Sequence, residues 1–93
     1  MNLNQLRYFV SVAESGSFTK GARRLYISHS TTSRAISALE EELGRRLLDR
    51  DNRVLGLTAA GELMLVEAKN IIASVDGLGE RLRSLSPEAE RQV

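Results

Sequence analysis

The chain has 93 residues, and its 42% hydrophobic and 27% charged residues give the balance of one small globular domain. It contains no cysteine, which excludes disulfides, thiolate metal ligands and a cysteine nucleophile. Neither an apolar run of membrane-spanning length nor a secretory signal is visible, so we expect a cytoplasmic protein without membrane partners.

The net charge of +1 conceals an asymmetry along the chain. Residues 1–61 hold nine Lys or Arg against six acids, whereas residues 62–93 hold four against six. A basic front and an acidic back are typical of a nucleic-acid reader that is attached to another segment.

Two helices are predicted before residue 26. The apolar stripe of the first has helical spacing and consists of Leu6, Phe9, Val10 and Ala13. Gly16 is suited to end this helix, because glycine readily adopts the left-handed conformation of a C-terminal cap. Ser17 is suited to begin the second helix as its N-cap. The buried face of this short helix is expected to contain Phe18, Ala22 and Leu25.

A third helix is predicted after the short glycine-free link formed by Tyr26 and Ile27. Ser28 is its expected N-cap, and it should run to about Leu43, with Gly44 just beyond its end. Its inward face is predicted to contain Thr32, Ile36, Leu39 and Leu43. Its outward face is short and polar, and consists of Ser30, Ser33, Arg34 and Ser37.

Two short segments rich in Leu and Val, residues 45–50 and 54–57, predict a β-hairpin. Asp51, Asn52 and Arg53 form its expected tip, because Asp and Asn tolerate turn geometry. Three helices followed by a hairpin predict a mainly α winged helix-turn-helix, in which the hairpin is the wing, over residues 1–57.

A long fourth helix is predicted over residues 58–86, with Thr58 as its cap and Pro87 as its stop. Its apolar residues follow a heptad pattern and are Met64, Ala68, Ile71, Val75, Leu78, Leu82 and Leu85. The first of these are expected to cover the domain itself. From about Val75 onward the helix should outrun so small a domain, so the remaining leucines are expected to meet a partner helix. Gly77 and Gly79 are expected to mark a bend or a frayed end. Residues 87–93 are expected to be a flexible tail.

The outward face of the third helix carries the functional hypothesis. Small hydroxyl residues allow a helix to approach the DNA major groove closely, and Arg34 can reach a guanine edge. The acids Glu40, Glu41 and Glu42 are confined to the end of this helix, which leaves its first turns free of carboxylates. An ordinary solvated amphipathic helix is the alternative interpretation of this face.

The sequence also resembles a known family. The similarity lies in ordered runs, namely LRYF at residues 6–9, GSFTKGA at 16–22, LYISHS at 25–30, SRAISALE at 33–40, ELG at 42–44, LLDR at 47–50 and LTAAG at 57–61. These runs are similar to those of LysR-type transcriptional regulators. They cover almost all of the chain up to the long fourth helix, which is the linker helix of this family.

The resemblance implies a DNA-binding segment whose third helix enters the major groove and whose wing touches the flanking backbone. It implies base-reading roles for His29, Ser30, Thr31, Ser33 and Arg34. The expected backbone and wing contacts are Thr19, Lys20, Ser37, Arg50 and Arg53.

In the family the long helix pairs antiparallel with its mate and leads to an effector-binding domain. The expected partners are therefore double-stranded DNA with an interrupted dyad-symmetric operator, and a second copy of the chain. A tetramer is expected only in a longer chain, and a small-molecule effector only through the domain absent here. The dimerisation residues are expected to be Ile71, Val75, Leu78, Leu82 and Leu85.

The chain departs from the family at five positions. The family usually has Gln in place of His29, Pro in place of Ser30, Gln in place of Ala35, an aromatic residue in place of Leu48 and a basic residue in place of Gly56. These departures concern the base preference more than the binding mode. His29 is the sole histidine and has no cysteine partner, so no metal site is expected.

Three other functions are possible alternatives for this sequence. A protein-interaction module that heterodimerises through the linker helix, with weak DNA binding, is the main alternative. An enzyme is disfavoured, because the sequence offers no paired carboxylates, no phosphate-binding loop and no nucleophile with a base, and no cofactor is expected. RNA binding is disfavoured because an aromatic content of 4% offers little stacking surface.

Overall fold

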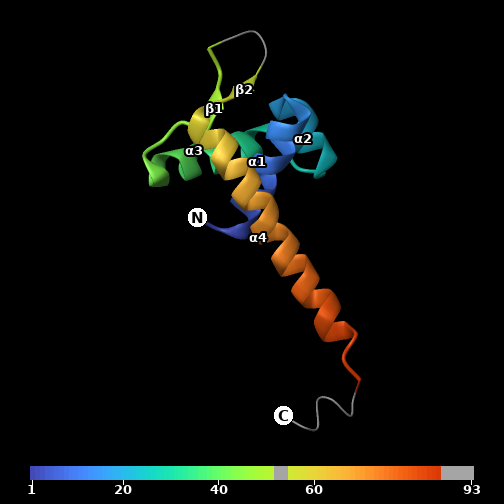
Figure 1. Ribbon diagram of the computed structural model, residues 1–93. Coiled ribbons are helices and arrows are strands. Elements are labelled where there is room, and N and C mark those ends of the chain that lie inside the picture. Colours follow the sequence, from blue (N-terminus) through green and yellow to red (C-terminus); the bar gives the residue numbers. More distant parts are fainter. Residues whose placement is uncertain (52–54, 87–93) are drawn as a thin grey trace.

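The computed structural model describes residues 1–51 and 55–86 (Figure 1). Its elements are α1 (Leu3–Ser15), α2 (Phe18–Arg24), α3 (His29–Leu43), β1 (Leu48–Asp49), β2 (Gly56–Leu57) and α4 (Ala59–Arg83). The first three helices and the hairpin gather into one body, from which the second half of α4 projects. The predicted fold class, a winged helix-turn-helix followed by a long helix, is confirmed.

The helix boundaries follow from their caps. The side chains of Ser17, Ser28 and Thr58 each accept a hydrogen bond from the backbone N–H three residues on, as an N-cap requires. Gly16 and Gly44 end α1 and α3 with φ angles of 66° and 65°, in the left-handed region. All five of these predicted caps are therefore confirmed.

The core lies where α1, α3 and the start of the hairpin meet. Its fully buried side chains are Phe9, Val12, Ile36, Leu39, Leu47 and Leu48. The buried face of α1 is wider than the predicted stripe, because Ser11 and Val12 are buried while Val10 and Ala13 are only half-buried. The reason is the close approach of α2, in which a Cβ on Gly21 would lie 2.7 Å from Val12. Ser11 donates to the carbonyl of Gly21 over 2.9 Å.

The hairpin is shorter than predicted. β1 pairs antiparallel with β2, with Leu48 opposite Leu57 and Asp49 opposite Gly56. The strand does not begin at residue 45, because the backbone N–H groups of Leu47 and Leu48 donate to the side chain of Glu40 instead. The predicted tip residues Asn52 and Arg53 lie outside the described residues.

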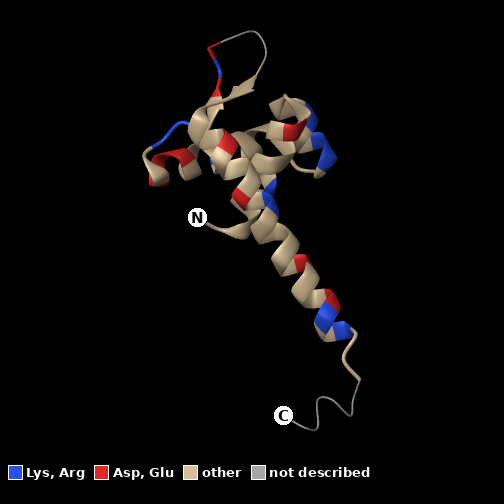
Figure 2. Ribbon diagram, in the orientation of Figure 1, with Lys and Arg blue, Asp and Glu red and all other residues tan. Residues whose placement is uncertain are grey.

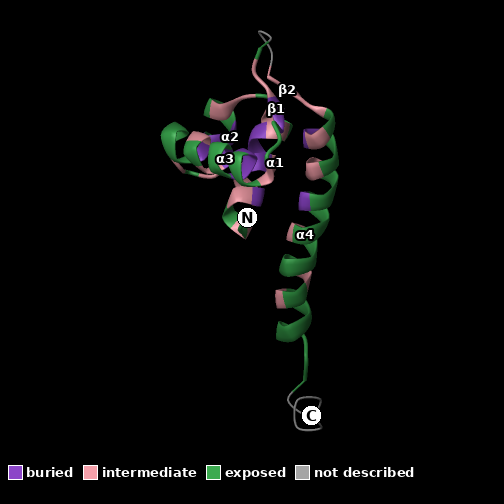
Figure 3. Ribbon diagram, turned by 90° about the vertical axis from the view of Figure 1, so that its left-hand side faces the viewer, coloured by how far each residue is buried: buried purple, intermediate pink, exposed green. Residues whose placement is uncertain are grey.

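Helix α4 has two different halves. In the first half, Gly61 and Ala68 are buried against the body, whereas the second half is exposed almost all round (Figure 3). Exposure of the apolar stripe begins at Ile71, one turn earlier than the sequence predicted. Among residues 1–51 and 55–86, no helix combines the length and apolar character that crossing a membrane requires.

The predicted end and bend of α4 need correction. The helix runs through Gly77 and Gly79 without interruption and ends at Arg83, three residues before the predicted end. Ser86 is disfavoured in helical geometry because it precedes a proline, so the helix ends before this residue. Leu85 therefore lies beyond the helix, although it remains exposed. The predicted tail, residues 87–93, lies outside the described part of the chain.

Candidate nucleic-acid interface

A tight turn joins α2 to α3. The N–H groups of Tyr26 and Ile27 donate to the carbonyls of Arg23 and Ala22, over 3.2 and 3.1 Å. Tyr26 has a φ angle of 57°, a left-handed conformation that costs a residue with a side chain roughly 1 kcal/mol or more. Its side chain is 96% exposed. The turn is thus closed without glycine, and it sets the angle at which α3 leaves α2.

Helix α3 separates an apolar face from a polar one. Thr32, Ile36 and Leu39 are fully buried, and Leu43 is half-buried. Of the predicted contact residues, Ser33 is half-buried and the others are exposed, namely His29, Ser30, Thr31, Arg34 and Ser37. All six are therefore at least partly accessible, and we call these six residues together the α3 outer face.

Charge is distributed unevenly around this face. Figure 2 shows the acids of α3 gathered at its C-terminal end. In α2, Arg23 and Arg24 lie in the last turn. The first turn of α3 contains no acid. Because the N-terminal end of a helix carries a partial positive charge, this part of the α3 outer face favours an anion such as phosphate.

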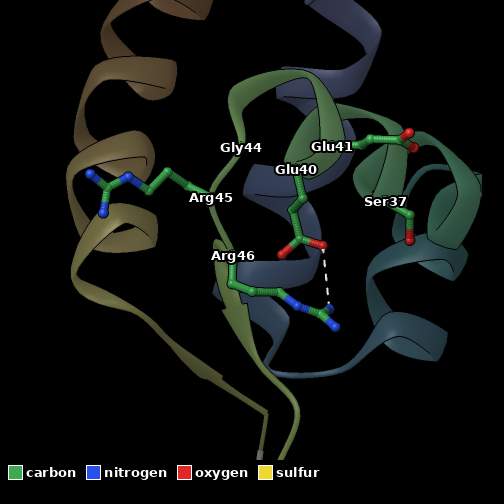
Figure 4. A pocket seen from close by; sticks show the side chains of 6 residues that line it. All are labelled: Ser37, Glu40, Glu41, Gly44, Arg45 and Arg46. Atoms are coloured by element: carbon green, nitrogen blue, oxygen red, sulfur yellow. Dashed lines mark ion pairs between the residues drawn. The ribbon is translucent and has the colours of Figure 1, made fainter.

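Glu40 is the acid whose position the sequence interpretation missed. Its side chain is 7% exposed and lines a surface hollow with Ser37, Glu41, Gly44, Arg45 and Arg46 (Figure 4). One carboxylate oxygen accepts from the N–H groups of Leu47 and Leu48, over 2.8 and 3.2 Å. The other accepts from Arg50 at 3.0 Å and lies 3.9 Å from a guanidinium nitrogen of Arg46. The spacing gave a signal for this burial, because Glu40 follows the buried Ile36 by four residues.

The predicted backbone contacts of α2 and of the wing differ in how exposed they are. Thr19 and Lys20 are exposed in the first turn of α2. Arg50 is only 29% exposed, because its guanidinium pairs with Glu40 and lies over the Phe18 ring, 5.2 Å from the ring centroid. Arg53 lies outside the described residues.

Residues 1–51 and 55–86 contain no group of three or more His, Cys, Asp or Glu side chains that could hold a metal ion. They also leave no buried side-chain nitrogen or oxygen without a hydrogen-bond partner. The polar interior of the described chain is therefore satisfied by the chain itself.

A short helix, a tight turn and a second helix with an exposed polar face define a helix-turn-helix, and the adjoining hairpin defines the winged form. Residues 3–62 match the family model for bacterial regulatory helix-turn-helix proteins of the lysR family. The chain belongs to this family, as the sequence resemblance predicted.

Curated relatives support the assignment. The chain is 47% identical over 88 residues to the HTH-type transcriptional activator AllS of Salmonella typhi, a match that covers 95% of this chain and 29% of the relative. It is 42% identical over 81 residues to the HTH-type transcriptional regulator TfdT of Cupriavidus pinatubonensis, which covers 87% of this chain and 36% of the relative. The chain thus spans about a third of the length of these relatives. Their names describe transcriptional regulators, which confirms the expectation of a non-enzymatic class.

Solved structures show the same arrangement. The DNA-binding domain of BenM in complex with benA site 1 DNA superposes with a TM-score of 0.89 and 40% identity, covering 92% of this chain and all of that one. The DNA-binding domain of CbnR in complex with DNA gives a TM-score of 0.84 and 40% identity, covering 90% of this chain and 97% of that one.

Proposed function

We propose that the chain is the segment of a LysR-type transcriptional regulator that binds double-stranded DNA and reads its sequence. The observation that carries this proposal is the α3 outer face, which is exposed, polar and free of acids in its first turn. A helix of this kind fits the major groove, where donor and acceptor patterns distinguish all four base pairs. The likeness to the BenM and CbnR domains, both solved with DNA, supports the same mode.

We assign the contacts by their position on this surface. Base edges would be contacted from the start of α3, by His29, Ser30, Thr31, Ser33 and Arg34. The DNA backbone would be contacted from α2 and from the middle of α3, by Thr19, Lys20 and Ser37. The predicted contact of Arg53 lies outside the described residues and rests on the family resemblance alone. Arg50 was predicted as another backbone contact, but its guanidinium pairs with Glu40 and lies over the Phe18 ring.

We further propose that α4 pairs with α4 of a second copy. Ile71, Val75, Leu78 and Leu82 are each 43–55% exposed and follow one another in steps of four, three and four. These steps are the same in both directions, so an antiparallel partner would place Ile71 opposite the partner's Leu82, and Val75 opposite the partner's Leu78. Such a seam of exposed apolar side chains is stabilised when a second helix covers it.

A symmetric dimer would present two α3 outer faces to the DNA. This predicts an operator of two half-sites related by dyad symmetry and separated by a spacer. Because the operator lies on the chromosome, we place the protein in the bacterial cytoplasm. A longer chain, like those of the relatives, would add the domain that senses a small molecule and would allow a tetramer.

A second candidate function rests on the same exposed seam. A module that heterodimerises through α4 and binds DNA weakly would also need Ile71, Val75, Leu78 and Leu82 exposed in the isolated chain. The two functions differ in DNA binding, which only the first requires to depend on sequence.

The test is a change of base preference. Duplexes enriched from a random-sequence library by the chain are compared with those enriched by Arg34→Ala and by Arg53→Ala. Arg34→Ala should relax the preference at one base pair in each half-site, with a loss of about 1–3 kcal/mol. Arg53→Ala should weaken binding to all duplexes and reduce its salt dependence. If neither variant changes the enriched sequence, the proposed division between base and backbone contacts is wrong.

A further inference from the structure

Four side chains form a continuous chain of contacts, two from α3, one from α2 and one just after β1. The Glu40 carboxylate accepts from Arg50 at 3.0 Å. The Arg50 guanidinium lies 5.2 Å from the centroid of the Phe18 ring. The Phe18 ring in turn contacts the His29 ring, with centroids 5.7 Å apart and planes inclined by 50°. Contacts thus connect the buried Glu40 of α3, through Arg50 just after β1 and Phe18 of α2, to His29, the first residue of α3.

Arg50 is held in this cluster on two sides. Its charge is paired with a carboxylate that is 7% exposed, and its flat face lies over an aromatic ring. A guanidinium is suited to this arrangement, because it can donate from its edge while it stacks through its face. The neighbouring Glu40 carboxylate already neutralises the charge of this guanidinium, which would weaken its attraction for a DNA phosphate. Lys20 and Arg34, by contrast, have exposed side chains.

The far end of the cluster lies on the α3 outer face. His29 is the first residue of α3 and is exposed. Among the described residues, its one aromatic ring contact is with Phe18, and this contact restrains the plane of the imidazole. A hydrogen bond to a base edge depends on that plane, since productive contacts tolerate only about 10–20° of misorientation. The residues that hold Phe18 in place therefore influence which base His29 can read.

We propose that Arg50 is a positioning residue that acts through Phe18 on His29, so that Glu40, Arg50 and Phe18 determine the base preference at the His29 position without touching DNA. This inference rests on the proposed sequence-specific binding. It assigns Arg50 a role different from that of a phosphate contact. The two roles predict different slopes of affinity against salt concentration for a variant that lacks the guanidinium.

The experiment compares base preferences position by position. His29→Ala first identifies the base pair that His29 reads, among duplexes enriched from a random-sequence library by the chain. Arg50→Met and Phe18→Leu should then lower the preference at that same base pair by about fivefold or more, the loss of one base contact. The base pair that depends on Arg34 should keep its preference. Arg50→Lys, which keeps the charge but not the planar face, should behave like Arg50→Met.

The salt dependence separates positioning from a phosphate contact. With a positioning role, Arg50→Met leaves the slope of log affinity against log salt unchanged. With a phosphate contact, that slope falls by about one, and binding to every sequence weakens alike. The latter result would overturn the inference, as would an unchanged preference at the His29 base pair. Arg45→Met is the matched control, because it removes an exposed arginine from the same connection.

A measurement without DNA keeps the inference separate from the proposed function. His29 is the only histidine in the sequence, so its imidazole C–H signals in a proton NMR spectrum belong to one residue. Arg50→Met and Phe18→Leu should both shift these signals in the free chain, and Arg45→Met should not. Shifted signals with no enriched DNA sequence would support the cluster but contradict sequence-specific binding. Unshifted signals would overturn the inference even if binding is specific.

Discussion

The two halves of α4 carry the same heptad pattern but have different surroundings. In the first half, Gly61 and Ala68 are buried against the body. In the second half, Val75, Leu78 and Leu82 have 44–55% of their surface exposed. A stripe of apolar residues therefore shows which side of a helix is to be covered, but not whether its own chain or another one covers it.

The difference has a geometric cause. Helix α4 has 25 residues and α1, against which it packs, has 13. At about 1.5 Å per residue, α4 extends well beyond its support. The described residues are accordingly elongated, with extents of 56 × 26 × 18 Å.

Gly61→Ala should have the largest effect. A Cβ at this position would lie 1.9 Å from the backbone oxygen of Leu47, which also accepts the N–H of Thr58. Because backbone rather than a flexible side chain stands in the way, we expect a loss of about 4 kcal/mol in the free energy of unfolding. Urea denaturation followed by circular dichroism measures it. A loss below about 1 kcal/mol would mean that the backbone of α4 at Gly61 does not pack closely against the backbone of Leu47.

Leu82→Asp should act on association rather than on folding. Each copy would lose the burial of one leucine, worth about 1.5–3 kcal/mol, so the dimer should lose about 3 kcal/mol or more. This corresponds to a dissociation constant raised by roughly a hundredfold, measured by sedimentation equilibrium. Thermal unfolding of the dilute monomer should change little.

Val66→Asp is the matched control for this variant. Val66 is 58% exposed on the same helix, but at 3.6 residues per turn it lies nearly half a turn around from Leu82. The control should therefore remain a dimer. A dimer that survives Leu82→Asp, or is lost with Val66→Asp, would contradict the proposed seam.

Gly77→Ala should stabilise the projecting half. In contrast to Gly61, the nearest atom to an added Cβ is the end of the flexible Arg81 side chain, at 3.5 Å. Alanine is favoured over glycine inside a helix by about 1 kcal/mol, so the free energy of unfolding should rise by roughly that amount. The helical circular dichroism signal should not fall. Destabilisation would show that the helix needs glycine here.

The smallest effect is expected for the ion pair that links the second half of α4 to α1. Asp76 accepts from Arg7 at 2.8 Å, and this hydrogen bond holds the pKa of Asp76 below its ordinary value of 3.8. A carboxylate whose pKa is lowered by folding stabilises the folded state at pH values above its ordinary pKa. This contribution is lost as the pH falls through the lowered pKa of the folded state. Both side chains are well exposed, so the contribution is small and screened by salt.

Asp76→Asn should therefore be slightly less stable than the original chain at pH 7, and this difference should shrink as the pH falls toward 2. Thermal unfolding at the two pH values measures the difference. A difference that stays constant across this range would mean that the ion pair does not contribute.

The sequence predicted the parts of the fold that depend on local chemistry. Caps such as Ser28 and Thr58 were found because a short polar side chain and a glycine have fixed roles at helix ends. The exposed heptad residues were also found, although exposure begins one turn earlier, at Ile71. The predicted contact residues of α3 are all at least partly accessible, and their contacts with DNA stay predictions.

The parts that were missed depend on contacts between distant segments. Glu40 was grouped with Glu41 and Glu42 as a surface acid, but the wing strand supplies backbone donors and Arg50 that satisfy it in the interior. For the same reason the hairpin is shorter than its Leu and Val content predicted. Spacing along one helix can place a residue on the inner face, but it cannot supply the partner that makes burial of a charge favourable.

The most direct test of sequence-specific binding is fluorescence anisotropy with two labelled duplexes, one enriched from a random library by the chain and one scrambled, over a series of salt concentrations. Binding that is tighter to the enriched duplex, with a difference that persists as salt rises, is the predicted result. Equal binding to both duplexes that disappears with salt would contradict the account, since it would leave only a basic surface, and the heterodimerising module would then be the better explanation of α4.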